Sequence, residues 1–371
     1  MKNLLILIRN KLLCVSYIFL LRPVLFCFDP EKTHDFITQV GVFLGHHAFT
    51  KWKTKLFFSF FHPMLEQNIL GIHFPNPVGL AAGFDKNALL TDILPSVGFG
   101  FEEVGSITGE QCEGNSKPRL WRLRKSKALA VHYGLKNDGC EKITSRLKGK
   151  NFKIPIGTNI AKTNSPQTVE TGAGINDYVK AFSKFTDIGD YFVINISCPN
   201  AFGGEPFTDP EKLNRLLKEI DKKETKKPIF LKISPDLSRE QVEGILEVCK
   251  HHRIHGFVCS NLTKDRKNLK IKDNINYFKG GISGKVMDDL STNQIRLIYQ
   301  RTRGKYIIIG CGGIFSAEDA YKKIKAGASL VELITGMIFK GPQMISEINR
   351  GLMFLLKRDG FHHLTEAVGT E

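Results

Sequence analysis

The chain has 371 residues, which is enough for one large α/β barrel with extra elements and too many for one small domain. Hydrophobic residues make up 42% and charged residues 24%, so a disordered chain is excluded. The net charge of +16 predicts an anionic partner such as nucleic acid, acidic lipid or a phosphorylated ligand. The eight cysteines form no CxxC pair, which argues against a disulfide framework or zinc site and favours a reducing compartment.

The first sixty residues are apolar and basic. Residues 4–21 contain two apolar runs separated by Arg9 and Lys11, and we expect Arg22-Pro23 to end the second. The longer run has 10 residues, whereas a membrane-spanning helix needs about 20. Eight basic against three acidic residues over 1–60 suit an anionic leaflet. The pattern predicts a helix in the membrane interface; a true span, a signal peptide or a helix docked on the protein core are the alternatives.

From residue 76 onward, short β-rich runs alternate with helical patterns. Most runs are almost continuously apolar, as strands buried on both faces must be. Eight β–α units favour an α/β fold of the TIM (β/α)8 barrel class over a doubly wound sheet, which lacks a GxGxxG after its first strand. The expected strands are 78–83, 101–107, 154–160, 191–197, 228–234, 256–261, 306–310 and 330–335.

Signals between and before these runs complete the predicted organisation. Asp209-Pro210 is an expected helix start, and Ser238-x-x-Gln241 is a capping box. Residues 108–153 are too many for one loop and are expected to hold inserted structure. We expect an N-terminal membrane-associating segment at 1–67 and a catalytic barrel at 68–371.

Polar residues stand where all eight predicted strands end. In a TIM barrel the chemistry lies at these ends, and a polar residue after every strand is difficult to explain as turn chemistry alone. The glycines of 310–313 and 280–284, together with Thr335-Gly336, are expected to let backbone N–H groups approach a phosphate. The rim positions are Lys86, Ser106, Asn159, Asn195, Cys198, Asn200, Lys232, Ser260, Asn261 and Thr335.

Two lysines and one cysteine suggest what the rim does. Lys86 and Lys232 would point into one pocket, and burying two ammonium groups requires negative charge, which a ligand that becomes anionic would supply. The asparagines suit a planar, amide-rich ring. Cys198 can act as base or nucleophile, with an inert buried thiol as the alternative, and the glycine-bearing loop 201–206 beside it is a candidate lid.

Seven motifs occur in the order found in one enzyme family. The chain resembles the dihydroorotate dehydrogenases, FMN-containing TIM barrels, from about Asp29 to Met344. The segment 28–34 (FDPEKTH) resembles the opening signature of the quinone-linked, membrane-associated class, whose helical extension holds a quinone tunnel. The motifs are AAGFDK, NISCPN, PIFLKISPDL, SNLT, GGISG, IIIGCGGI and ASLVELITG.

The resemblance implies roles for individual residues. Cys198 takes the position of the base that removes the C5 proton of dihydroorotate, and Lys232 that of the cation beside reduced FMN. His34 and Arg122 match quinone-site positions, and no metal is implied. Substrate contacts are implied for Lys86, Gly134, Leu135, Asn195, Asn200 and Asn261. FMN contacts are implied for Ala82, Gly83, Lys86, Ser106, Asn159, Asn195, Lys232, Ser260, Gly284, Gly313, Ile334 and Thr335.

Four positions depart from the family pattern. Cys198 is the base type of the soluble class, whereas the quinone-linked class has serine. Val131 stands where a substrate-binding Asn is usual, and His132 is a candidate substitute. Leu262 replaces a hydroxyl residue, and Ile334 replaces a Tyr that lines the quinone tunnel, so a different quinone preference is expected.

The expected function is oxidation of (S)-dihydroorotate to orotate with electrons passed to a membrane quinone, in de novo pyrimidine (UMP) biosynthesis. A soluble-type enzyme using fumarate or NAD, a tRNA dihydrouridine synthase-like FMN barrel, and a non-catalytic membrane-anchored barrel are the alternatives. We expect a monomer that binds an anionic lipid surface and no nucleic acid. It would lie on the cytoplasmic side of the cell membrane, or on the mitochondrial inner membrane in a eukaryote.

Overall fold

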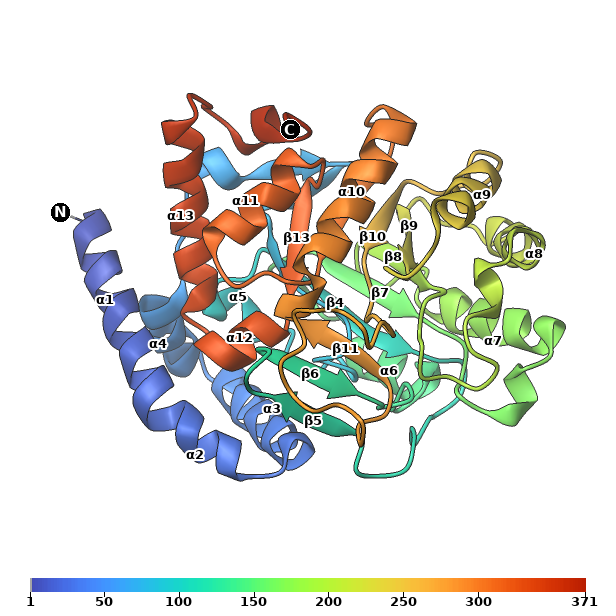
Figure 1. Ribbon diagram of the computed structural model, residues 1–371, viewed down its shortest axis with the longest axis horizontal. Coiled ribbons are helices and arrows are strands. Elements are labelled where there is room, and N and C mark those ends of the chain that lie inside the picture. Colours follow the sequence, from blue (N-terminus) through green and yellow to red (C-terminus); the bar gives the residue numbers. More distant parts are fainter. Residues whose placement is uncertain (1) are drawn as a thin grey trace.

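A closed barrel of eight parallel strands forms the centre of the molecule (Figure 1). The computed structural model describes residues 2–371. The order of the strands around the barrel follows the chain, and their ends differ from the expected ends by at most three residues, so the predicted TIM barrel is confirmed. The strands are β3 (Val78–Leu80), β4 (Phe101–Ile107), β7 (Ile156–Ile160), β8 (Tyr191–Asn195), β9 (Ile229–Ile233), β10 (Gly256–Cys259), β12 (Ile307–Cys311) and β13 (Leu330–Leu333).

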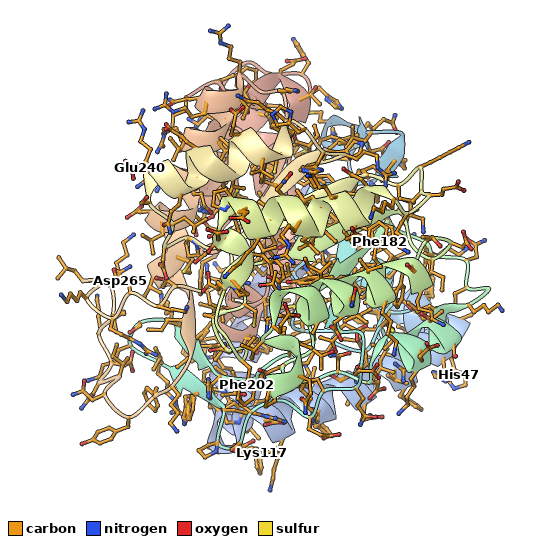
Figure 2. The ribbon with its side chains drawn as sticks, turned by 90° about the vertical axis from the view of Figure 1, so that its right-hand side faces the viewer. His47, Lys117, Phe182, Phe202, Glu240 and Asp265 are labelled. Atoms are coloured by element: carbon orange, nitrogen blue, oxygen red, sulfur yellow. The ribbon has the colours of Figure 1, made fainter. Side chains whose placement is uncertain are left out.

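An outer layer of helices covers the barrel because their apolar faces pack on the strands. Phe182 of α7, labelled in Figure 2, stacks on Phe192 of β8 with ring centroids 4.1 Å apart. The predicted starts of α8 and α9 are confirmed, with Asp209 accepting a hydrogen bond from Lys212 N and a complete Ser238–Gln241 capping box. The helices are α5 (Leu94–Val97), α6 (Cys140–Leu147), α7 (Thr171–Lys184), α8 (Pro210–Asp221), α9 (Arg239–Cys249), α10 (Asp288–Thr302), α11 (Ala317–Lys325), α12 (Thr335–Lys340) and α13 (Met344–Arg358). Single 3₁₀ turns lie at Pro63–Leu65, Pro166–Thr168, Pro206–Thr208, Lys285–Met287 and Leu364–Ala367.

A small hairpin closes the amino-terminal end of the barrel. Strands β1 (Gln67–Ile69) and β2 (Ile72–Phe74) pair in antiparallel fashion. Phe74 packs edge-to-face on Phe101 inside the barrel, with ring centroids 5.6 Å apart. The half of the barrel interior at the amino-terminal ends of the strands is therefore a packed apolar core. The half at their carboxyl-terminal ends can hold polar groups.

The segment 108–153 does hold inserted structure. Strands β5 (Leu120–Leu123) and β6 (Ala128–Val131) form a hairpin, and β11 (Gly281–Gly284) pairs with β6 to complete a three-stranded antiparallel sheet. The glycine-rich segment before the seventh barrel strand is therefore itself a strand. This sheet lies over the carboxyl-terminal end of the barrel strands (Figure 1).

The N-terminal extension is helical, and one expectation about it is wrong. Helix α1 (Lys2–Ser16) continues through a π-helical turn (Tyr17–Leu21) into α2 (Arg22–Cys27), so Pro23 does not end the helix. Pro23 lies in the first turn after the widened segment, where its missing N–H and bulky ring are tolerated. The stretch Leu4–Cys27 has 24 residues and by length and composition could cross a membrane.

One side of this extension is tied to the barrel and the other is exposed. Helices α3 (Pro30–His46) and α4 (Ala48–Phe58) follow α2. The Arg9 guanidinium donates to Ser346 Oγ of α13 at 2.7 Å, and the Tyr17 hydroxyl donates to the Ile338 carbonyl at 2.7 Å. Large apolar side chains face solvent from all four helices, among them Leu12, Phe19, Leu20, Val24, Phe36, Phe43, Phe49 and Trp52. Exposed apolar side chains on four successive helices are typical of a membrane-contact surface.

A buried ion pair fixes α3 on the inserted sheet. Glu31 accepts hydrogen bonds from Arg119 Nε at 3.1 Å and from Nη2 at 2.8 Å, and both side chains are almost fully buried. Lys117 also lies 3.5 Å from Glu31 Oε1, but 65% of its side chain is exposed.

Replacing Glu31 by Gln should leave the Arg119 charge buried without its partner. We expect the free energy of unfolding, measured in urea, to fall by about 3 kcal/mol. Lys117→Gln removes an exposed cation from the same carboxylate and should change it by less than about 1 kcal/mol. Equal effects of the two variants would contradict a special role for the Glu31–Arg119 pair.

Candidate active site

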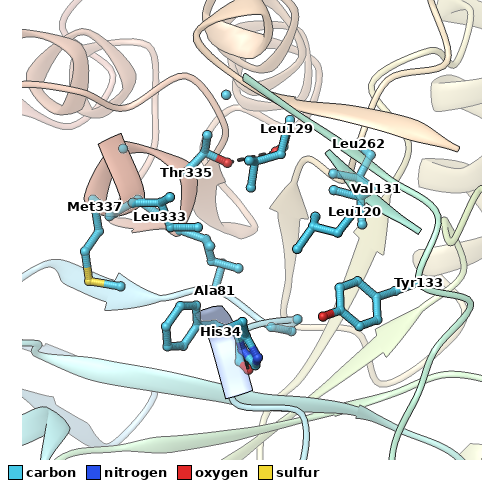
Figure 3. Close-up of a pocket in the computed structure, with 18 of the residues that line it drawn as sticks. His34, Ala81, Leu120, Leu129, Val131, Tyr133, Leu262, Leu333, Thr335 and Met337 are labelled. Carbon is cyan, nitrogen blue, oxygen red and sulfur yellow. Dashed lines mark hydrogen bonds between the residues drawn. The ribbon is translucent and has the colours of Figure 1, made fainter. Parts of the chain in front are cut away.

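One cavity of about 400 Å³ joins the mouth of the barrel to the N-terminal helices (Figure 3). Its barrel end is polar and contains Cys198 and Lys232, and its other end is apolar. Of the candidate residues, all but Asn159 line this cavity: His34, Ala82, Gly83, Lys86, Ser106, Arg122, Gly134, Leu135, Asn195, Cys198, Asn200, Lys232, Ser260, Asn261, Gly284, Gly313, Ile334 and Thr335. The apolar end is lined by Tyr17, Leu21, Leu25, Phe26, Ile37, Met337 and Ile338.

Lys232 extends from β9 into the barrel interior, where two carboxyl groups compensate its positive charge. Its Nζ lies 2.8 Å from Glu332 Oε1 and 3.4 Å from Glu103 Oε2. Burial alone lowers the pKa of Lys232, but these carboxyls overcome that effect and raise the pKa above its ordinary value. The expectation that only a ligand would supply the negative charge is therefore wrong for Lys232.

A hydrogen-bonded row of amides and hydroxyls leads from this lysine to the rim. Asn159 Nδ2 donates to Glu103 at 3.0 Å, and Asn159 Oδ1 accepts from the Ser106 hydroxyl. Asn195 Nδ2 in turn donates to Ser106 Oγ at 2.9 Å, and Asn261 Nδ2 donates to Asn195 Oδ1 at 3.2 Å. Asn159 thus lies behind Ser106 and orients it, while the other amides face the cavity. Fixed amides of this kind are preorganised for a planar polar ligand.

Cys198 follows β8 and is half-buried at the cavity wall. Burial raises the pKa of its thiol to about 11, while the Asn200 N–H and Lys162 act in the opposite direction. The candidate lid beside it is held in place, because Lys162 Nζ donates to the Phe202 carbonyl at 2.6 Å. Phe202 itself lies on the outside of the molecule (Figure 2).

Lys86 connects the rim to the N-terminal extension. Its Nζ lies 3.5 Å from His34 Nε2 and 4.3 Å from the centre of the Tyr133 ring, a cation–π contact. Burial lowers the pKa of Lys86 to about 8. Burial, together with Lys86, also lowers the pKa of His34, so this imidazole is neutral at neutral pH. The His34 and Tyr133 side chains face each other across the cavity in Figure 3.

The arginine expected near the quinone supports α2 and α3. Arg122 of β5 donates from Nη1 to the Phe28 carbonyl at 2.7 Å, and its guanidinium lies 4.6 Å from the centre of the Phe26 ring. Both contacts are at the apolar end of the cavity, where Arg122 is one of the few charged groups.

The glycines after β12 and β13 let the backbone at the cavity pack closely on neighbouring backbone. Gly313 has φ +78°, and an added Cβ would lie 2.3 Å from Asp288 Cα. A Cβ on Gly336 would lie 2.2 Å from the Ile314 carbonyl oxygen. Thr335 is held by a 2.8 Å hydrogen bond with Ser283 of β11, dashed in Figure 3. Such a cradle suits a phosphate group.

The departures from the family pattern all lie at the cavity. Val131 offers its backbone instead of a side-chain amide, since its carbonyl accepts from Asn200 Nδ2 at 2.8 Å. His132 Nδ1 lies 3.4 Å from Asn200 Oδ1 and so contacts the amide rather than lining the cavity. Leu262 and Ile334 both line the cavity, and they make it more apolar than hydroxyl-bearing residues would.

Sequence reasoning missed several residues that shape the site. Glu103 and Glu332 were hidden within apolar strands, although an acidic residue in a buried run is itself a signal. Tyr133 lines the cavity, and among residues 2–371 its hydroxyl finds no hydrogen-bond partner. Ser260 Oγ is likewise buried and unpaired within the described chain. These orphaned groups and the glycine cradle are what a planar, phosphate-bearing cofactor requires. No cluster of three or more metal-ligating side chains occurs within 2–371.

A (β/α)8 barrel with such a site is typical of an oxidoreductase that carries a flavin. Comparison with known proteins agrees. The family profile for dihydroorotate dehydrogenase matches residues 64–356. Proteins named dihydroorotate dehydrogenase (quinone) from Trichodesmium erythraeum and Christiangramia forsetii are 37% and 40% identical, covering 92% and 90% of this chain and 94% and 98% of their own.

A solved structure supports the same conclusion. The ligand-free DHODH from Eimeria tenella superposes with a TM-score of 0.80 at 30% identity, covering 92% of this chain and 99% of its own. The chain therefore belongs to the dihydroorotate dehydrogenase family, whose members are flavin-dependent oxidoreductases.

Replacing Gly313 by Ala should prevent flavin binding, because the new methyl group would lie 2.3 Å from Asp288 Cα and would force the backbone that lines the cavity to move. We expect the purified variant to lose its yellow colour and its flavin absorbance. Gly149→Ala is the matched control, since Gly149 has φ +76° but an added Cβ meets nothing within 4 Å. Retention of a full complement of flavin by Gly313→Ala would contradict the cradle.

Proposed function

We propose that this chain oxidises (S)-dihydroorotate to orotate with FMN as its flavin and passes the electrons to a membrane quinone. This reaction is a step of de novo pyrimidine (UMP) biosynthesis. The observation that carries the proposal is that one cavity is polar beside Cys198 and apolar beside His34. Such a cavity can receive a polar ring at one end and an apolar ring at the other.

The cofactor would be held by the barrel rim. Thr335, Gly284 and Gly313 would bind the phosphate, and Lys232 would stabilise negative charge on the flavin ring. When bound, FMN would supply the hydride acceptor and the electron store that amino acids lack. Further contacts would come from Ala82, Gly83, Lys86, Ser106, Asn195, Ser260 and Ile334, with Asn159 orienting Ser106.

The chain's own residues would prepare the substrate. Asn195, Asn200 and Asn261 would hydrogen-bond the pyrimidine ring, and Lys86, with Gly134 and Leu135, would bind its charged edge. Cys198 would remove the C5 proton as general base, for which the thiol must first be deprotonated. Support comes from the fixed orientation of the amides and from the position of Cys198 at the same polar end.

The quinone would enter from the N-terminal helices. Leu21, Leu25 and Ile37 make that end apolar, and His34 and Arg122 would supply its polar contacts. The neutral imidazole of His34 can accept or donate one hydrogen bond without placing a second charge beside Lys86.

The exposed apolar face of α1–α4 would seat the chain on the membrane. We propose that residues 1–67 form this membrane and quinone segment and that 68–371 form the catalytic barrel. Arg9 and Tyr17 tie α1 and the π turn to the barrel, which supports a helix lying in the interface rather than crossing it. The net charge of +16 would attract anionic lipid rather than nucleic acid.

The compartment and the assembly are also proposals. Eight free cysteines fit a reducing compartment, and hence the cytoplasmic side of a cell membrane, or the mitochondrial inner membrane in a eukaryote. We also propose that the chain acts as a monomer, because all the proposed substrate, flavin and quinone contacts can come from its own residues.

Removing the thiol of Cys198 should slow flavin reduction by dihydroorotate about 10²–10⁴-fold while FMN stays bound. Because the pKa of Cys198 is raised to about 11 and the base must be deprotonated, the wild-type rate should rise with pH up to that value. Cys198→Ser should retain part of the rate, with its rise displaced to higher pH. Stopped-flow bleaching of the flavin across pH 6–10 measures all three.

Cys249→Ala is the matched control for that series. Cys249, on α9, is more fully buried than Cys198, and burial raises the pKa of its thiol to about 12. Its removal should leave the rate and the pH profile unchanged. If Cys198→Ala bleaches at the wild-type rate throughout the range, then Cys198 is an inert thiol and not the base.

Filling the apolar end of the cavity should impair quinone reduction alone. Ile37 lines the cavity from α3, whereas Val40, one turn later, is exposed. We expect Ile37→Trp to raise the KM for ubiquinone or menaquinone at least about tenfold and to leave flavin reduction by dihydroorotate unchanged. Val40→Trp is the control and should change neither quantity.

The acceptor assay also separates the rival functions. Turnover of the wild-type protein with fumarate or NAD and not with a quinone would contradict the proposed acceptor. A flavoprotein that does not oxidise dihydroorotate would contradict the proposed reaction altogether.

A further inference from the structure

Three ionisable side chains meet inside the barrel, below the proposed flavin site. Glu103 comes from β4, Lys232 from β9 and Glu332 from β13. Glu332 Oε1 lies 2.8 Å and Glu103 Oε2 lies 3.4 Å from Lys232 Nζ. Both carboxyl side chains are completely buried, and 5% of the lysine side chain is exposed. Two carboxyls therefore compete for one ammonium group out of contact with water.

The charges of this group do not balance if both acids are ionised. One ammonium and two carboxylates leave an excess negative charge, and an uncompensated buried charge costs several kcal/mol. Within the described chain, Lys232 is the only cation within 4 Å of either carboxyl. A bound proton would remove the imbalance.

The other neighbours of the two carboxyls are neutral. Asn159 of β7 donates to Glu103, Tyr191 of β8 lies beside Glu103, and Cys311 of β12 lies beside Glu332. Burial raises the pKa of both Tyr191 and Cys311 well above their ordinary values, so neither contributes charge. Burial and the proximity of Glu332 also raise the pKa of Glu103 to about 8. Glu103 Oε1 and Glu332 Oε2 are both buried without another partner within residues 2–371.

We propose that Glu103 and Glu332 share one proton beneath Lys232 and that this pair tunes the reduction potential of the flavin. This inference rests on the proposed placement of FMN beside Lys232. With the proton bound, the three groups carry no net charge; without it, they carry one negative charge. A negative charge there opposes formation of an anionic reduced flavin. The pair would take a proton from solvent when the flavin receives two electrons and release it when the quinone removes them.

Removing either carboxyl should abolish this effect. Glu332→Gln and Glu103→Gln each leave one carboxylate and one ammonium, which are neutral together at every pH. The reduction potentials of the two variants and the wild type should agree below about pH 7. Above about pH 8 the reduction potential of the wild type should fall below those of both variants. The expected difference is at least about 30 mV, which for a two-electron couple disfavours reduced flavin about tenfold.

Glu102→Gln is the matched control for this titration. Glu102 precedes Glu103 on β4, is also fully buried, and has a raised pKa because of burial and Asp85. It points to the opposite face of the strand, away from Lys232. We expect its potential to follow that of the wild type across pH 6–10. A wild-type profile in Glu332→Gln and Glu103→Gln, or the same altered profile in Glu102→Gln, would overturn the proposal.

A second measurement tests the pair without any flavin. Infrared spectra of the full chain in the Glu102→Gln background should show the carbonyl band of a protonated carboxylic acid that disappears as pH rises through about 8. Adding Glu332→Gln should remove that band at neutral pH. Absence of the band from the Glu102→Gln protein would contradict the shared proton. If the band is present but the protein binds no flavin, the pair stands and the proposed function fails.

Discussion

The buried pair between Glu31 and Arg119 holds the start of α3, which forms part of the outer wall of the cavity, against the inserted sheet. Glu31 begins α3, and Arg119 directly precedes β5 of the inserted sheet, so the pair joins two segments far apart in the chain. Pro30, Thr33, His34 and Ile37 line the cavity from the start of α3 and are placed by this contact. Because this wall covers the barrel mouth, it helps to keep water from the polar groups around Lys232, whose charges act most strongly in a low-dielectric setting.

Most of the fold was predictable because the barrel strands are short, apolar and separated by ordinary helix signals. The capping box at Ser238 and the apolar face of α8 are local features, and local features are visible in sequence. The continuation of the N-terminal helix past Pro23 was not predictable. It depends on the π-helical turn before Pro23, and such a turn has no sequence signal of its own. The pairing of β11 with β6 joins residues about 150 positions apart, which no periodicity records.

The polar residues near the strand ends were predictable, whereas Glu103 and Glu332, which stand among apolar strand residues, were missed. Cys198, Asn195 and Lys232 follow from position along the barrel, and the structure brings them to one cavity. The partners of Lys232 come from strands that face β9 across the barrel. The sequence alone does not show which side chains meet there. The same holds for Tyr133, whose contact with Lys86 requires the inserted sheet to lie over the rim.

The two ends of the cavity are encoded in separate parts of the gene. Residues between Tyr17 and Ile37 build most of the apolar wall, whereas the barrel strands build the polar floor. Mutations that adapt the enzyme to a different lipid-soluble acceptor can therefore accumulate in one segment without disturbing the chemistry of the other. Met337 and Ile338 of α12 are exceptions, since they line the apolar end from outside that segment. A lineage that changes its respiratory carrier would need few coordinated substitutions.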